Sequence, residues 1–198
     1  MFLRKLGFTM IELLIVIAVL GILAVAVLAA INPIEQINRG RDTGSRSDAE
    51  QLLSAIDRFY ASQGYYPWRT AADDLEADGS APIDAAAFTP VDMEFVDTAA
   101  AAVLTKLSDG GTAELKESFV NRIVDSGYNS LQVYNQGGQG DSTYVCFVPK
   151  SGSFLEEAEA RCGGTGATFG EDLPDDLAPM VGSVCVAEDS PLNMVCLP

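Results

Sequence analysis

The side chain that most needs a chemical explanation is the carboxylate of Glu12. It stands at the start of an apolar run, because Leu13–Ile31 comprises nineteen residues without a polar side chain. An ionised group in hydrocarbon costs on the order of 2–3 kcal/mol at the centre of a bilayer, and less near an end. A carboxylate at this position therefore calls for a positively charged partner.

Side chains for catalysis are scarce. The chain contains no histidine, which excludes Ser-His-Asp and Cys-His catalysis and histidine-ligated zinc sites. No aromatic-lined sugar site accompanies the carboxylates that glycoside cleavage would need. We expect a protein that is not an enzyme.

Four cysteines lie in the last third of the chain: Cys146, Cys162, Cys185 and Cys196. No two of them have the C-x-x-C spacing of zinc ribbons and redox dithiols. An even number behind a membrane-targeting start indicates two disulfides in an oxidising compartment; buried free thiols in a cytosolic domain are the alternative. Of the three pairings that four cysteines allow, we expect Cys185–Cys196 across a short hairpin and Cys146–Cys162 around a short helix.

One loop gathers carboxylates of the kind that calcium binds through oxygen. They are Glu171, Asp172, Asp175 and Asp176. Their spacing does not match an EF-hand, and such clusters arise by chance in an acidic chain. We expect no cofactor, with calcium at this loop as the alternative.

The charge is concentrated in the second part of the chain. From Ser47 onward there are 25 acidic and seven basic residues, in a chain of 198 residues with a net charge of −16. This surface repels phosphate backbones, so we expect no direct nucleic-acid binding by the globular part. The length predicts one domain with an appendage.

The apolar run is long enough to cross a membrane, since nineteen helical residues span about 28 Å against roughly 30 Å of hydrocarbon. A simple signal anchor would hold Arg4 and Lys5 on the cytoplasmic side. A cleaved secretory signal would use the small residues around Val27–Ala29. Both interpretations leave Glu12 unexplained, and a third gives it a partner.

The stretch KLGFTMIELLIV, followed by Gly21, resembles the N-terminus of type IV prepilins and type II secretion pseudopilins. In that family a prepilin peptidase removes a short basic leader that ends in glycine, and commonly N-methylates the new terminus. The resemblance implies cleavage between Gly7 and Phe8, methylation of Phe8, and Glu12 as the fifth residue of the mature chain. The Phe8 ammonium would then face Glu12 in the same helix or in a staggered neighbour.

The resemblance implies a structural subunit that polymerises with its own kind into a type IV pilus-like filament. Its partners would be other pilin subunits, the prepilin peptidase, an inner-membrane platform protein, an assembly ATPase and, before assembly, membrane lipid. It would cross the cytoplasmic (inner) membrane once with its N-terminus inside, and later form an extracellular or periplasmic filament. A type II secretion pseudopilin is the first alternative. A monomeric membrane-anchored binding or enzymatic domain outside the cell is the second.

The residues after the apolar run also predict helix. Apolar residues recur at spacings of one, three and four between Ile34 and Tyr60, and Gly64 is a natural C-terminal cap. We expect Pro33 to kink one long helix from Phe8 to about Ser62. The resulting parts are a leader at 1–7, a membrane or filament-core helix at 8–32, an amphipathic half at 33–63 and a globular head at 64–198.

The head is predicted to be α+β, with a small antiparallel sheet of about four strands against the amphipathic half of the helix. The expected helices cover 92–106, 113–123 and 153–161, the last with Ser153 as its N-cap. The expected hairpins cover 127–150, and 182–187 with 193–197. The runs RDTGSRSDAEQLLSAIDRFYASQGYYPW and VCFVPKSGSFLEEAEARCGG also resemble pilins predicted in uncultured bacteria.

Overall fold

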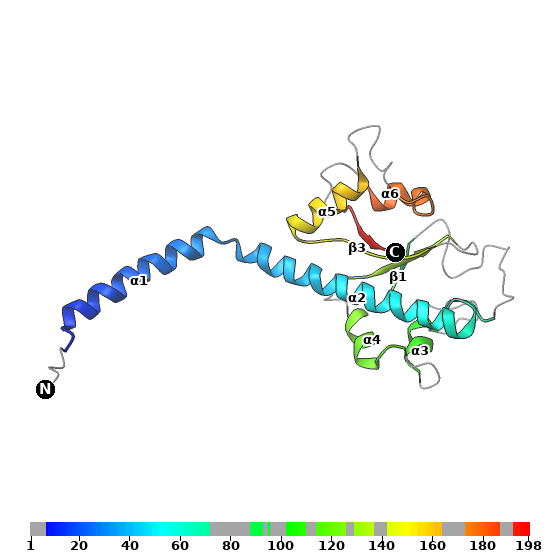
Figure 1. Ribbon diagram of the computed structural model, residues 1–198, viewed down its shortest axis with the longest axis horizontal. Helices are drawn as coiled ribbons and strands as arrows, with labels where there is room; N and C mark the ends of the chain where they lie inside the picture. Colours follow the sequence, from blue (N-terminus) through cyan, green and yellow to red (C-terminus); the bar gives the residue numbers. More distant parts are fainter. Residues whose placement is uncertain are drawn as a thin grey trace, which may run out of the picture. The chain divides into compact units, whose positions relative to one another are not determined.

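The computed structural model describes residues 7–71, 88–92, 95, 102–109, 114–125, 129–136, 142–163, 173–186 and 192–198. The chain divides into two units, Met1–Ile37 and Asn38–Pro198. Along the chain the elements are α1 (Met10–Ala30), α2 (Pro33–Gln63), β1 (Thr89–Pro90), α3 (Val103–Ser108), α4 (Glu117–Ile123), β2 (Gln132–Asn135), β3 (Thr143–Phe147), α5 (Gly152–Cys162), the 3-10 turn η2 (Ala178–Met180), α6 (Val181–Val184) and β4 (Val195–Leu197) (Figure 1).

Helix α1 is apolar around its whole circumference apart from Glu12. A helix of this kind belongs in lipid or inside a bundle. Among the described residues, one helical stretch, Met10–Ala29, is long and apolar enough to cross a membrane. This agrees with the span expected from the sequence.

A two-residue break separates α1 from α2. Ile31 has an extended backbone, with φ −98° and ψ 131°. Asn32 then caps α2, since its Oδ1 accepts a hydrogen bond from the Glu35 amide at 3.4 Å. Pro33 begins α2, where its missing N–H has no cost, and a residue before proline avoids the helical conformation. The single kinked helix that we expected is therefore interrupted at this point.

In the head, α2 presents an apolar stripe to the core, as its periodicity predicts. The fully or almost fully buried members are Ala49, Leu52, Ala55, Ile56 and Phe59. Tyr60, expected on this stripe, is instead 40% exposed and stacks on Tyr66 with ring centroids 4.6 Å apart. Gly64 ends the helix with φ +80° and donates its N–H to the Tyr60 carbonyl at 2.8 Å, which is the expected glycine cap.

Among the described residues, the sheet has four strands in the order β1-β2-β3-β4, and each neighbouring pair is antiparallel. The hairpin of β2 and β3 confirms the first one expected, while its glycine-rich turn lies outside the described residues. The second expected hairpin is wrong, because 181–184 forms α6 and β4 pairs with β3 instead. Val181 and Val184 stand three residues apart, a helical spacing, and this places Val184 in the core.

The shorter helices start and end differently from the expectation. Helix α3 covers 103–108 and ends two residues beyond the predicted range 92–106, while α4 covers 117–123 within the predicted range 113–123. Residues 93–94, 96–101 and 113 of these ranges lie outside the described residues. Helix α5 extends one residue beyond 153–161 at each end, and its N-cap is Ser151 rather than Ser153. The cap moves because the Ser151 amide and hydroxyl both bind a carboxylate of α2, described below.

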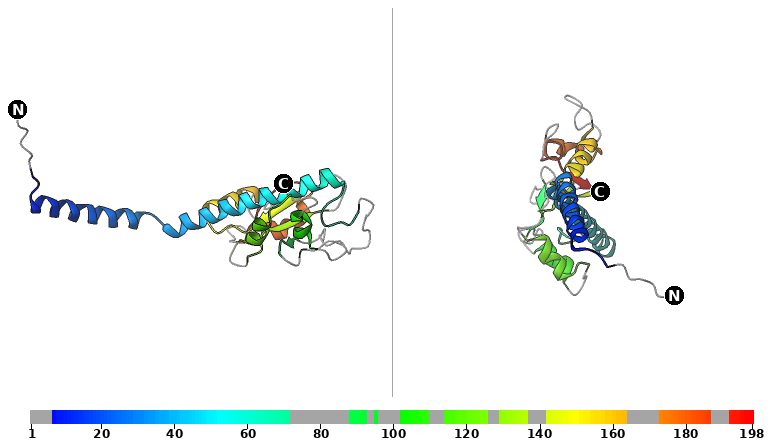
Figure 2. Two further views of the ribbon diagram at one scale, coloured as in Figure 1. Left: turned by 90° about the horizontal axis from the view of Figure 1, so that it is seen from below. Right: turned by 90° about the vertical axis from the view of Figure 1, so that its left-hand side faces the viewer.

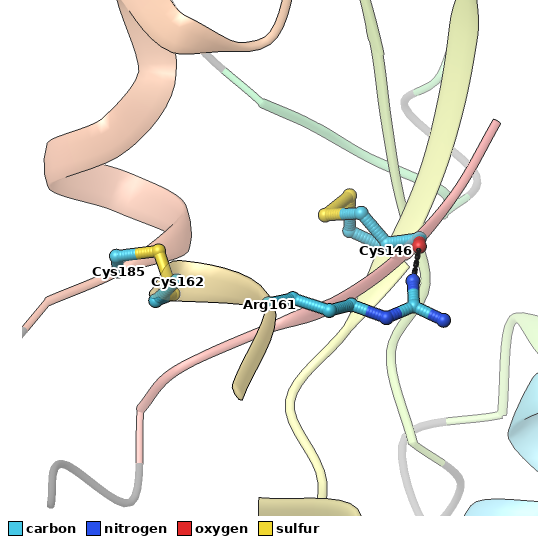
Figure 3. The surroundings of a disulfide bond; sticks show 5 residues. Cys146, Arg161, Cys162 and Cys185 are labelled. Atoms are coloured by element: carbon cyan, nitrogen blue, oxygen red, sulfur yellow. Dashed lines mark hydrogen bonds between the residues drawn. A yellow bond between two sulfur atoms is a disulfide. The ribbon is translucent and has the colours of Figure 1, made fainter. Parts of the chain in front are cut away.

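Both disulfides form, but the pairing that we expected is wrong. The bonds join Cys146 to Cys196 and Cys162 to Cys185, with Cα atoms 4.1 and 5.7 Å apart. Cys146 and Cys196 face each other because β3 and β4 are neighbours in that register. Cys185 follows α6, not a strand, and bonds to the last residue of α5 (Figure 3).

Arg161 ties α5 to the C-terminal strand beside these bonds. Its Nη1 donates to the Cys196 carbonyl at 2.5 Å, a contact visible in Figure 3. Its Nη2 donates to Glu157 at 2.9 Å. Glu157 also pairs with Arg46 of α2, so a chain of charged contacts runs from α2 through α5 to β4.

Helix α2 is held from two sides. On the side of α5, Arg46 forms an ion pair with Glu157. On the side of α4, Asp48 forms an ion pair with Arg122 at 2.5 Å. Figures 1 and 2 show α4 and α5 on opposite sides of α2. Positions 46 and 48 are two residues apart, about 200° around a helix, and so point in nearly opposite directions.

The most buried of these contacts belongs to Asp42, which has no exposed surface. Its carboxylate accepts hydrogen bonds from the Lys150 amide at 3.0 Å and from the Ser151 amide and hydroxyl at 2.7 and 2.6 Å. The Asn129 side-chain amide adds a fourth partner at 3.3 Å. The carboxylate also lies at the N-terminus of α5, where negative charge is favoured. Asp42 therefore locks the start of α5 onto α2.

We predict that Asp42→Ala lowers the free energy of unfolding of the head by about 3 kcal/mol, because the buried amide and hydroxyl of Ser151 and the partly buried amide of Lys150 lose their acceptor. Urea unfolding of the full chain in detergent, followed by the fluorescence of the single, buried Trp68, measures the change. Glu50→Ala, at an exposed position of the same helix, should change it by less than about 0.5 kcal/mol. Equal effects of both substitutions would contradict this role of Asp42.

Candidate functional site

The candidate site is the segment from Gly7 to Glu12, where the sequence predicts processing and charge pairing. Gly7, Phe8 and Thr9 are non-helical and exposed, and α1 begins immediately after them. Phe8 is 87% exposed, and open space surrounds the α-carbon of Gly7. The peptide bond between Gly7 and Phe8 thus lies in an accessible, irregular stretch directly in front of a helix.

Glu12 is held by Thr9 in a reciprocal cap of α1. The Glu12 Oε2 atom accepts the Thr9 amide at 2.8 Å and the Thr9 hydroxyl at 2.6 Å. In return the Thr9 Oγ1 accepts the Glu12 amide at 3.3 Å. Thr9 has the extended backbone of an N-cap residue, with φ −82° and ψ 150°. The pair forms a capping box, in which two N–H groups that a helix leaves without partners are satisfied.

The capping box explains in part how a carboxylate is stabilised at the start of an apolar helix. A carboxylate in the first turn meets the positive end of the helix dipole as well as the two Thr9 donors. Within the described chain, every hydrogen bond to this carboxylate ends on Oε2. The other oxygen, Oε1, is therefore left to accept a further donor.

Sequence reasoning missed Thr9, although the signal was present. Thr-x-x-Glu directly before an apolar run is the sequence signature of a capping box. The resemblance to prepilins had indicated the Phe8 ammonium as the partner of Glu12 instead. The structure brings Thr9 and Glu12 together through hydrogen bonds in both directions.

Two of the four carboxylates proposed for calcium lie among the described residues. Glu171 and Asp172 lie outside the described residues. Asp175 is exposed, and Asp176 accepts the Tyr144 hydroxyl at 2.6 Å and the Ser142 amide at 3.1 Å. In the part of the chain that the structure describes, no group of three or more metal-ligating side chains gathers. Calcium at this loop stays a prediction.

The contact between Asp176 and Tyr144 shifts both titrations. Burial raises the pKa of Tyr144 to about 12, and the neighbouring Asp176 carboxylate adds to the effect. For Asp176, burial pushes the pKa upward, but the hydrogen bonds from Tyr144 and Ser142 outweigh it and the pKa falls below its ordinary value. The carboxylate is thus engaged in tying the segment after Leu173 to strand β3.

The N-terminal segment matches a known family model. Residues 3–28 fit the model described as the prokaryotic N-terminal methylation motif. The matched range includes Gly7, Phe8 and Glu12, and it supports the resemblance to type IV pilins and pseudopilins. No curated protein and no solved structure matches the chain.

We predict that Asp176→Asn lowers the pKa of Tyr144 from about 12 toward its ordinary value of 10. The raised pKa means that this contact stabilises the folded head fully below pH 10 and ceases to do so as the pH rises through about 12. Ultraviolet titration of tyrosinate, with Tyr144→Phe to identify the step, measures the shift. An unchanged titration in Asp176→Asn would show that Asp176 does not bind Tyr144.

Proposed function

We propose that this chain, which carries the N-terminal methylation motif of the type IV pilin and pseudopilin family, is a structural subunit of a pilus-like filament. It is cleaved between Gly7 and Phe8 and assembles through α1. The observation that carries the proposal is the arrangement in front of α1: an exposed Gly-Phe bond, then a capped carboxylate, then a helix with no other polar side chain.

The uniform apolar surface of α1 suits two successive environments. The helix can rest in lipid before assembly and among the same helices of other subunits afterwards, because neither environment supplies water to polar groups. Helices with no polar feature can slide past one another in such a bundle. Glu12 is the one ionisable group between Met10 and Ala30, so it can fix the register of neighbouring subunits.

The capping box leaves Glu12 able to make two separate contacts, one through each oxygen of its carboxylate. Thr9 satisfies Oε2 in the precursor, which lowers the cost of keeping a carboxylate near lipid. After cleavage, the ammonium of Phe8 on an incoming subunit can bind Oε1 of a subunit already in place. A charge pair formed in surroundings of low dielectric constant is strong enough to select that register.

We predict that the mature protein begins at Phe8 and that its terminal amine is methylated. Mass spectrometry of the protein purified from membranes of a cell with a prepilin peptidase determines this directly. Replacement of Gly7 by a bulky residue, such as Gly7→Leu, should leave the precursor uncut. A mature chain that retains Met1, or that starts at Ala30, would overturn the proposal.

We predict that Glu12→Ala is processed normally but lowers the yield of sheared filaments about tenfold or more, because the charge pair is lost. Glu12→Gln is the sharper variant, since glutamine can still accept the Thr9 amide in a capping box but carries no charge. If pairing with an ammonium is the role, Glu12→Gln assembles as poorly as Glu12→Ala. A wild-type yield from Glu12→Gln would reduce Glu12 to a helix cap.

Filament length and function separate the two members of the family. A pilus subunit forms long surface filaments, whereas a type II secretion pseudopilin forms a short filament whose loss stops protein export. The same Glu12 variants, scored for both readouts, distinguish them. A membrane-anchored monomer would show neither effect.

A further inference from the structure

A polar groove of about 720 Å³ lies between α2 and α4. Its wall on α2 is formed by positions spaced three and four apart, namely Ser47, Glu50, Gln51, Ser54 and Arg58. Its other wall comes from the start of α4 and the residues before it, including Glu114, Lys116 and Arg122. The groove lies wholly within the unit Asn38–Pro198.

Basic side chains gather in this groove although the head is strongly acidic. Arg58, Lys116 and Arg122 are three of the seven basic residues after Ser47, whereas only two of the 25 acidic residues, Glu50 and Glu114, line it. Arg58 binds Glu114 and Arg122 binds Asp48, yet 54% and 49% of these two side chains remain exposed. Within the described chain, the ammonium of Lys116 makes no hydrogen bond or ion pair.

Exposed acids lie on α5, the helix that flanks α2 on the side away from α4. Glu156 is exposed and Glu159 is partly exposed on α5, and their spacing of three residues places them on one face of that helix. Neither carboxylate has a partner among the described residues. Helix α5 and helix α4 flank α2 on opposite sides (Figures 1 and 2).

We propose that the groove between α2 and α4 binds the Glu156–Glu159 face of α5 from a second copy of this chain. The proposal rests on the proposed function, in which copies of the chain lie side by side. Heads with so large an excess of acidic residues repel each other over most of their surface. A second head is therefore best accepted where the cations gather, and the carboxylates of α5 supply the complementary charge.

The position of the two surfaces determines the kind of assembly. A contact between two different surfaces of one chain is heterologous, and it repeats from copy to copy unless the rotation happens to close a ring. With the groove and the acidic face on opposite sides of α2, each head can use both surfaces at once. The contact thus extends along a filament, and added salt should weaken it because the charges are exposed.

Charge reversal in the full-length chain, in cells that assemble filaments, tests the contact. Lys116→Glu alone and Glu156→Lys alone should each lower the filament yield about tenfold, since like charges then oppose each other. The double variant should restore the yield, because the reversed pair attracts again. Lys116→Glu should still fold, since an acid at the N-terminus of α4 is favourable. Lys150→Glu, an equal change of charge at an exposed position outside the groove, should assemble normally.

Several results would overturn the contact. A wild-type filament yield from Lys116→Glu would show that the groove is not an interface. Failure of the double variant to recover would separate Lys116 from Glu156. Loss of heparin binding in Lys116→Glu, with an unchanged filament yield, would assign the groove to a soluble polyanion instead.

Cross-linking keeps this proposal distinguishable from the proposed function. Carbodiimide treatment of membranes that hold a mixture of ¹⁵N-labelled and unlabelled full chains joins a lysine to a carboxylate in contact with it, with loss of water. A Lys116–Glu156 link between labelled and unlabelled copies supports the contact even if no filament forms, which would overturn only the proposed function. Filaments without this link would overturn only the contact.

Discussion

Carboxylates that lie in or next to apolar surroundings need hydrogen-bond donors, and this requirement shapes both units of the chain. Asp42 has no exposed surface and is satisfied by the amides and hydroxyl that begin α5. Glu12 stands at the edge of an apolar helix and is satisfied by Thr9. In the head, the four partners of Asp42 are complete and hold elements together. Among the described residues, the hydrogen bonds to the Glu12 carboxylate end on Oε2, which leaves Oε1 as the atom on which the proposed contact with another subunit depends.

The sequence predicts best where periodicity and local rules act alone. The apolar helix, the buried stripe of α2 and the glycine cap at Gly64 follow from residue spacing and from glycine's tolerance of positive φ. The match of residues 3–28 to the methylation motif supports the resemblance to type IV pilins and pseudopilins that this segment shows in the sequence. Each of these features depends on residues within a few turns of one another.

The errors arise where distant segments decide. Ser153 looked like the N-cap of α5, but Asp42, more than a hundred positions earlier, binds Ser151 and moves the cap. Cys185 and Cys196 were expected to face each other across a hairpin. Instead, β4 pairs with β3, which places Cys146 opposite Cys196 and makes them disulfide partners. At Pro33 the error has a local cause. The Asn32 side chain caps α2 and stabilises the start of a new helix, so the chain does not continue as one kinked helix.

The bond between Cys146 and Cys196 has a mechanical consequence. It encloses the segment from Cys146 to Cys196, whose ends are separated by 50 residues in the sequence. Fifty residues of unfolded chain would extend to about 170 Å. Because the covalent loop cannot open under load, this length stays unavailable when a head is pulled apart. A stretched subunit can therefore lengthen only through the segments that precede β3, and its terminal strand keeps its place beside β3.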